Sequence, residues 1–206
     1  MLKKTTLLLC VVAFSATLGL ADDDLEVLWE EPYAPFPIMS GAFKSWGEYY
    51  TQDDFILDTD ALIKAIECWA IYTPFDDEDD HPQPFRISIR YDHYGMPGGL
   101  KLSASLPLQY IDETDTGDVY GYGEDAPKVW HYRFDFSGWR LDGGTPWWLE
   151  IRTEAQNFAW GARSVGNLYH QWNEHFYSAF FRLLGHFEET AIESASWGEI
   201  KAGFVD

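Results

Sequence analysis

Cysteine is almost absent from this chain, which limits the ways in which the fold can be held together. Only two cysteines occur in 206 residues. Cys10 lies in an N-terminal apolar stretch typical of a removable export signal, so Cys68 would have no partner for an intramolecular disulfide. Stability must therefore come from the core, for which 10 Trp, 12 Tyr and 14 Phe supply large apolar side chains.

Basic residues are also scarce. The chain has 14 Lys and Arg against 34 Asp and Glu, which gives a formal net charge of −20. A surface with this charge repels phosphate backbones, so we expect no nucleic acid among the partners.

The motifs of common enzyme and metal sites are missing. There is no Gly-x-Ser-x-Gly, no phosphate loop and no dinucleotide fingerprint, and the six histidines lack the spacing of zinc ligands. Glu150, beside Trp147 and Trp148, is the best single acid for a jelly-roll glycoside hydrolase, but no second acid stands two residues away on the same strand face. We therefore identify no catalytic residue and predict a non-catalytic protein, with the hydrolase as a less favoured alternative.

The N-terminus has the pattern of a signal peptide. Lys3 and Lys4 precede an apolar run over 5–20, and Ala21 is a small residue at the expected cleavage point. The run is short for a bilayer span and is followed at once by Asp22–Asp24. We predict a signal peptide over 1–21, no membrane span in the mature chain, and a secreted, extracellular or cell-surface location, with the periplasm as an open alternative.

Alternation of apolar and polar residues dominates the rest of the chain. In Phe85–Asp92 every second residue is apolar, and the glycines and proline of 95–99 then favour a tight reversal. Similar segments separated by turns occupy 53–57, 100–106, 129–136, 147–152, 158–160 and 177–184. This pattern predicts an all-β protein, an antiparallel β-sandwich or jelly roll of about eight strands.

Three parts of the chain are harder to assign. Residues 22–45 contain three prolines and are expected to form an extended lead-in rather than a regular element. The sandwich domain is placed at 46–186, with a long acidic surface excursion at 112–125, and a C-terminal tail at 187–206. Over 58–72 the helix-forming residues favour a helix, whereas local alternation also fits a buried strand.

A series of ordered motifs connects these segments to a known group of proteins. The motifs are Asp53-Asp54-Phe55-x-Leu57, Ile63-x-x-Ile66-x-x-Trp69-x-x-Tyr72, Phe85-x-Ile87-x-Ile89-x-Tyr91-Asp92, Trp130-x-Tyr132, Gly143-Gly144-Thr145-x-Trp147-Trp148, Phe158-x-Trp160 and Ala179-Phe180-x-Arg182-Leu183. Together they resemble a family of secreted bacterial β-sandwich domains of poorly characterised function, often found in surface-sorted proteins. The resemblance covers about residues 50–185 and implies that 58–72 contains a strand. The end of the chain, Trp197-Gly198-Glu199-Ile200-Lys201, resembles short tails of exported bacterial proteins, or else packs one aromatic residue on the domain.

Aromatic residues near loops and strand ends are candidates for sugar binding, since their rings can stack on sugars. They are Tyr120, Tyr122, Trp139, Trp147, Trp172 and Tyr177. The alternative is that most of them fill the core.

Two acidic runs are candidates for calcium, the only cofactor that the sequence leaves open. Carboxylates could come from Asp76, Asp77, Asp79 and Asp80, or from Asp112, Asp115 and Asp118. Neither run has the spacing of an EF-hand loop, so solvated acidic loops are the preferred interpretation.

The leading functional hypothesis is a secreted, non-catalytic module that binds a glycan or another cell-envelope component. A self-assembling subunit of a surface layer or fibre, which binds copies of itself, is the alternative.

Overall fold

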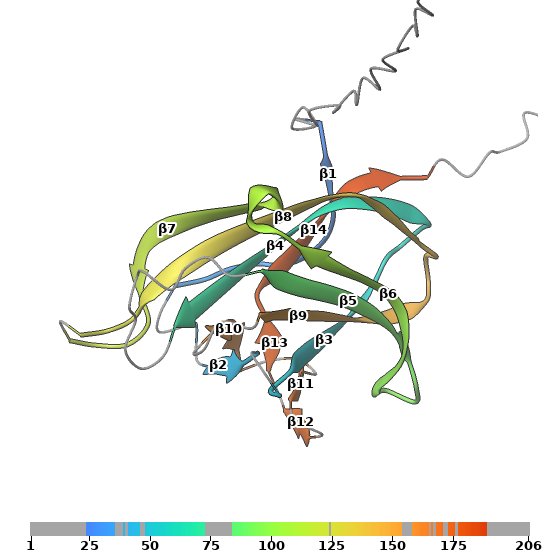
Figure 1. Cartoon of the computed structure of the whole chain (residues 1–206). Helices are drawn as coiled ribbons and strands as arrows, with labels where there is room; N and C mark the ends of the chain where they lie inside the picture. Colours follow the sequence, from blue (N-terminus) through green and yellow to red (C-terminus); the bar gives the residue numbers. More distant parts are fainter. Residues whose placement is uncertain are drawn as a thin grey trace, which may run out of the picture.

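The computed structural model describes residues 24–35, 39, 41–45, 48–72, 84–123, 125–153, 158–164, 166, 168–170, 173–175 and 177–188. Apart from a 3-10 turn, η2 (Leu108–Tyr110), every regular element in these residues is a β-strand. The strands form two antiparallel sheets that pack against each other (Figure 1), so the predicted all-β sandwich is confirmed. The predicted signal peptide and the Trp197–Lys201 tail lie outside the described residues.

The first sheet is organised around β4 (Ala61–Tyr72). One side of β4 pairs with β8 (Lys128–Leu141), and the other side pairs with β14 (Phe181–Phe187) and then with β10 (Phe158–Arg163). The remaining members are β7 (Ile111–Val119) beside β8, β1 (Glu26–Glu31) beside β14, and both β2 (Gly41–Lys44) and β13 (Ser178–Ala179) beside β10.

The second sheet has six strands. Their order is β12 (Asn173–His175), β11 (Leu168–His170), β3 (Thr51–Ile56), β9 (Pro146–Thr153), β5 (Phe85–Asp92) and β6 (Pro97–Leu106). β5 and β6 form a hairpin, and β6 is the last strand at that edge of the sheet.

β4 confirms the prediction of a strand over the ambiguous 58–72 segment. Ile66, Cys68 and Ala70 are fully buried between the sheets, and Ile71 is equally buried on the opposite face. Burial on both faces and hydrogen bonding along both edges stabilise the extended form, which outweighs the small helical preference of individual residues.

The N-terminal segment 22–45 contains more secondary structure than predicted. β1 and β2 both lie within 22–45, and β1 pairs with β14 over Glu26–Glu31. None of the prolines falls inside either strand, because β1 ends immediately before Pro32. The lead-in therefore contributes two edge strands to the sandwich instead of preceding it.

Two predicted loops are also shorter than expected. The acidic stretch expected to form an excursion over 112–125 begins with β7, which pairs with β8 through Asp115. Acidic residues suit this strand because it lies at a sheet edge, where they remain in solvent. In the β5–β6 hairpin, Pro97, Gly98 and Gly99 belong to β6, so only 93–96 form the connection.

The core lies mainly between the two sheets. Its largest fully buried side chains are aromatic and include Trp147, Tyr132, Phe85 and Phe134. A second, smaller cluster lies on the outer face of the first sheet, where Trp69, Ile71 and Phe180 pack with Met39.

Asp53 is a buried carboxylate that connects the two sheets. It lies on β3 with no exposed surface, and its Oδ2 accepts a hydrogen bond of 2.8 Å from the backbone N–H of Ala179 on β13. Its Oδ1 accepts a second bond, of 3.1 Å, from the backbone N–H of Asp54. Burial raises the pKa of Asp53 well above its usual value, and the negative charges of Asp54 and Glu31 raise it further, although the two N–H groups oppose the shift.

This pKa shift predicts a destabilising contribution of Asp53 at neutral pH. Between pH 3.8 and the raised pKa, the folded protein holds a proton that the unfolded chain has lost, so this contribution to stability decreases as pH rises. The variant Asp53→Asn keeps a neutral side chain at every pH. We expect the free energy of unfolding of the wild type, relative to that of Asp53→Asn, to fall between about pH 4 and pH 7 in urea titrations. A constant difference across this range would contradict the prediction.

Candidate binding surface at the β5–β6 hairpin

Exposed apolar side chains gather at the hairpin end of the second sheet. Tyr91, Tyr94, Met96 and Leu100 are 44%, 90%, 39% and 48% exposed, and all belong to β5, β6 or the turn between them. The hairpin extends from one end of the sandwich, at the lower right of Figure 1. Adjacent exposed apolar groups of this kind are typical of interaction surfaces.

The turn itself is strained at its most exposed residue. Tyr94 has a φ of 57° and Gly95 a φ of 78°, and the flanking His93 and Met96 exchange backbone hydrogen bonds of 2.8 and 3.3 Å. Positive φ at both central residues identifies a type I′ turn, in which Asn-Gly and Gly-Gly are the favoured pairs. A tyrosine in the left-handed region costs about 1–2 kcal/mol, and such strain is found most often at functional sites.

Asp92 holds this turn against the sheet. Its Oδ2 accepts a hydrogen bond of 3.1 Å from the backbone N–H of Gly95, and its Oδ1 accepts one of 2.9 Å from the indole N–H of Trp148. Trp148 is fully buried, so it fixes the position of the carboxylate. The ring of Tyr94 therefore projects from a rigid support.

A second ring lies at the base of the hairpin. The centroid of Tyr91 is 5.4 Å from that of the buried Trp147, and Lys101 Nζ lies 5.4 Å from the centroid of the Tyr91 ring and 5.6 Å from that of Trp147. These cation–π contacts hold the ammonium group beside the half-exposed Tyr91. Lys101 makes no ion pair within the described part of the chain, so its N–H groups are available to a ligand.

The aromatic residues predicted from the sequence do not form one surface. Tyr122 is 86% exposed in the β7–β8 connection, with the half-buried Tyr120 beside it, whereas Trp139 lies toward the other end of β8. Tyr177 is half-buried, with its ring 5.0 Å from that of Phe43. Trp147 is 1% exposed, so it supports the hairpin from within the core, and Trp172 lies outside the described residues.

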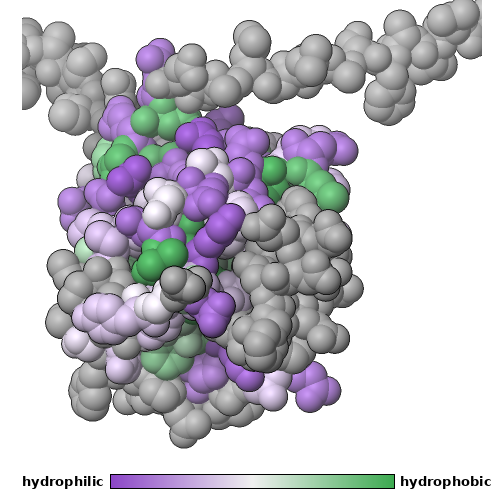
Figure 2. Space-filling model, turned by 90° about the vertical axis from the view of Figure 1, so that its left-hand side faces the viewer, coloured by the Kyte–Doolittle hydropathy of each residue, from purple (hydrophilic) through white to green (hydrophobic). Residues whose placement is uncertain are grey.

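The surface around the β7–β8 connection has a different character. Figure 2 views this side of the molecule, and its described residues are mostly hydrophilic, with the hydrophobic ones in small separate groups.

The sequence analysis did not identify Tyr91 and Tyr94 as site residues, because it assigned their stretch only to a strand and a tight turn. The available signal was a tyrosine directly before glycine in a two-residue turn, where asparagine is preferred.

The predicted calcium loops gain no support from the described residues. No group of three or more His, Cys, Asp or Glu side chains is arranged there to hold a metal ion. Asp118 accepts a hydrogen bond of 2.8 Å from Tyr33, Asp115 lies 3.3 Å from Lys128, and Asp112 does not join them in a cluster. The other run, Asp76, Asp77, Asp79 and Asp80, lies outside the described residues.

Glu150, the candidate acid of the hydrolase alternative, is held by internal partners. It is 3% exposed, its Oε2 accepts a hydrogen bond from Gln52 Nε2, and Arg90 Nε lies 3.3 Å from the same oxygen. A carboxylate in this arrangement is suited to binding strands β3, β5 and β9 together.

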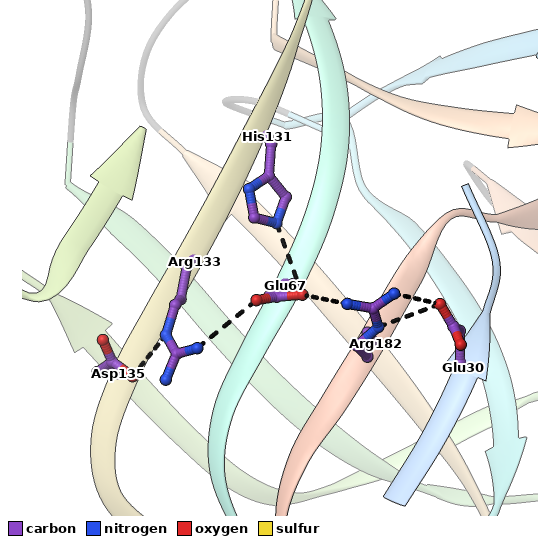
Figure 3. A network of polar contacts seen from close by, with 6 residues as sticks. All are labelled: Glu30, Glu67, His131, Arg133, Asp135 and Arg182. Atoms are coloured by element: carbon purple, nitrogen blue, oxygen red, sulfur yellow. Dashed lines mark hydrogen bonds and ion pairs between the residues drawn. The ribbon is translucent and has the colours of Figure 1, made fainter. Parts of the chain in front are cut away.

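A polar network covers the outer face of the first sheet (Figure 3). Glu67 on β4 is its centre, with Arg182 Nη1 at 3.1 Å, His131 Nε2 at 3.6 Å and Arg133 Nη1 at 3.7 Å. Arg182 also pairs with Glu30 on β1, and Arg133 pairs with Asp135 on β8. The network thus connects four neighbouring strands.

The environment of Glu67 favours its charged form. Burial alone would raise the pKa of Glu67, but the imidazole of His131 and the guanidinium groups of Arg182 and Arg133 together lower it. The adjacent Trp69 is covered by Tyr33, which stacks on it with ring centroids 5.3 Å apart, and by Arg182 on the ring. We conclude that this face is occupied by its own residues and stabilises the sheet.

No helix in the described residues is long and apolar enough to cross a membrane.

The strain at Tyr94 predicts that a glycine there stabilises the fold. Tyr94→Gly should raise the free energy of unfolding by about 1 kcal/mol, because glycine adopts positive φ without steric cost. Tyr122→Gly is the matched control, since Tyr122 is similarly exposed but has no positive φ. It should be neutral or destabilising in the same urea titration, and equal effects of the two changes would contradict the interpretation.

The Glu67 network predicts acid sensitivity. Because the folded pKa of Glu67 is lowered, its contribution is present at neutral pH and is lost as pH falls below about 4.5. Glu67→Gln should reduce the free energy of unfolding by about 2 kcal/mol at pH 7, because Arg182 and Arg133 lose their shared carboxylate partner. The difference should shrink toward pH 3, and a difference that grows on acidification would contradict the assignment.

Comparison of the chain with protein-family models, with curated proteins and with solved structures finds no match.

Proposed function

We propose that this chain is a secreted, non-catalytic β-sandwich module that binds a neutral glycan of the cell envelope or its surroundings through the β5–β6 hairpin. The observation that carries the proposal is Tyr94, which is 90% exposed in a strained backbone conformation that Asp92 and Trp148 hold in place. A free-energy cost retained at a fully exposed position is expected where the side chain serves a ligand.

The chemistry of the surface fits a sugar. Tyrosine rings pack against the C–H faces of pyranose rings, and two such rings, Tyr91 and Tyr94, belong to the same hairpin. Lys101 adds ammonium N–H donors beside Tyr91 for hydroxyl oxygens. The net charge of −20 disfavours polyanionic glycans, which is why the proposal specifies a neutral one.

Secretion is supported by the N-terminal sequence, in which two lysines, an apolar run and a small residue follow one another as in a signal peptide. The absence of a disulfide pair is compatible with this location because the aromatic core supplies stability. The resemblance to secreted β-sandwich domains points the same way.

Binding to neutral polysaccharides tests the proposal. We expect the purified chain to be retarded in gels that contain its glycan, or to bind it on a glycan array. Tyr94→Ala and Tyr91→Ala should each weaken this binding about tenfold, because each removes one stacking ring.

Tyr122→Ala is the matched control, since it removes an equally exposed tyrosine from another turn and should leave binding unchanged. Loss of binding in Tyr122→Ala alone would move the site to the β7–β8 connection. No binding to any polysaccharide by the wild type would overturn the proposed function.

A further inference from the structure

β6 is a long edge strand whose second half lacks the usual protection against pairing with another chain. It has ten residues, of which Lys101 is the only charged one. The other edges are shorter or acidic: β2 has four residues, β12 has three, and β1 has six that include three glutamates. Natural sheets discourage edge-to-edge contact by short edges, charges, prolines and bulges. In β6 these devices are confined to its first half, at Pro97, Lys101 and the register shifts opposite Ile89–Asp92, whereas Leu102–Leu106 pairs regularly with β5.

The surroundings of β6 are basic in an otherwise acidic protein. Arg86 on the neighbouring strand β5 is exposed, and its Nε donates a hydrogen bond of 3.2 Å to Ser103 on β6. Arg86 makes no ion pair within the described residues. Together with Lys101, it gives this edge a positive charge although the whole chain carries −20.

β7 is an edge of opposite character in the other sheet. Its first five residues, Ile111–Asp115, pair with β8 in regular register and leave their second side without a strand among the described residues. They include Asp112, Glu113 and Asp115; Glu113 accepts a hydrogen bond from Tyr132 and Asp115 lies 3.3 Å from Lys128, whereas Asp112 and Thr114 are exposed. The acidic edge therefore complements the basic edge in charge and in extended conformation.

We propose that the β6 edge of one copy of this chain pairs with the β7 edge of a second copy. The added strand would satisfy backbone N–H and C=O groups on both edges and bring Arg86 near the carboxylates of the second copy. Pairing of β6 with another β6 is less favourable, because each copy would bring Lys101 to the contact and the partner strand has no carboxylate to offset its charge.

This contact is heterologous, since it joins two different surfaces. Each copy then has one basic and one acidic edge available, so association continues into a ring or a fibre. The inference goes beyond glycan binding and does not depend on it, because neither Tyr91 nor Tyr94 takes part.

Two variants of the full chain test the contact by sedimentation velocity over a range of concentrations. The basic-edge variant carries Ser103→Glu and Ser105→Glu, and the acidic-edge variant carries Asp112→Ser and Thr114→Lys. All four positions are exposed, so both variants should keep the wild-type circular dichroism spectrum. We expect the wild type to associate as concentration rises, and each variant alone to associate about tenfold more weakly.

Mixing the two variants gives the decisive measurement. In the mixture the intact basic edge of one variant meets the intact acidic edge of the other, and the two altered edges also carry opposite charges, so the mixture should recover the association of the wild type. A wild type that stays monomeric at every concentration, a mixture that does not associate, or a homodimer of the acidic-edge variant would each overturn the proposal. Tyr94→Ala should associate like the wild type, which separates this result from the fate of the glycan proposal.

Discussion

The pairing of β4 along both edges is the constraint on which the rest of the fold depends. Residues 61–68 pair with β14 on one side, and 61–71 pair with β8 on the other. A strand in this position is surrounded by hydrogen bonds and by side chains on both faces, so its residues must be apolar or fully satisfied. This requirement explains the second cluster around Trp69 and Ile71 on the outer face, where Tyr33 and Met39 pack against side chains that would otherwise contact water.

Two of the buried acids of the sandwich, Glu67 and Asp53, have opposite environments. Glu67 is on β4 itself and is stabilised in its charged form by Arg182, Arg133 and the imidazole of His131 on neighbouring strands. Asp53 lies between the sheets, where backbone N–H groups are its partners and burial raises its pKa. The two carboxylates therefore contribute opposite pH dependences to stability, and Glu31, whose pKa is also raised by burial, acts in the same direction as Asp53.

Much of the architecture could be predicted because it follows from alternation that is visible locally. The strands at 85–92 and 146–153 have one apolar face throughout, and the order of turns then limits the fold to a sandwich. β4 was predictable only through the resemblance to other domains, because its local propensity is helical while its pairing is long-range. β1 and β7 were missed as strands for a related reason: edge strands are half solvated, so their acidic residues look like those of loops.

The candidate site could not be predicted from the aromatic residues alone. Many of the aromatic side chains must fill the core, and the sequence does not show which ones are exposed. Trp147 and Tyr91 are separated by 56 positions in the chain yet are directly paired across β5 and β9, and only the register decides that one is buried and the other half-exposed. The exposure of an aromatic side chain therefore depends on the register between neighbouring strands. The spacing of residues along the sequence does not specify this register.

The β5–β6 hairpin differs from the rest of the molecule because it keeps features that lower its own stability. Elsewhere most aromatic residues contribute to the core, and Glu67 and Arg182 are paired within the chain. In the hairpin, Asp92 and Trp148 use a buried hydrogen bond to hold an unfavourable turn, and β6 keeps a long edge with one charge. A sequence selected for stability alone would place asparagine or glycine at 94 and charges along β6. The strained Tyr94 and the weakly charged β6 edge both belong to the β5–β6 hairpin. This coincidence is the strongest physical reason to assign the contacts of this protein to that end of the sandwich.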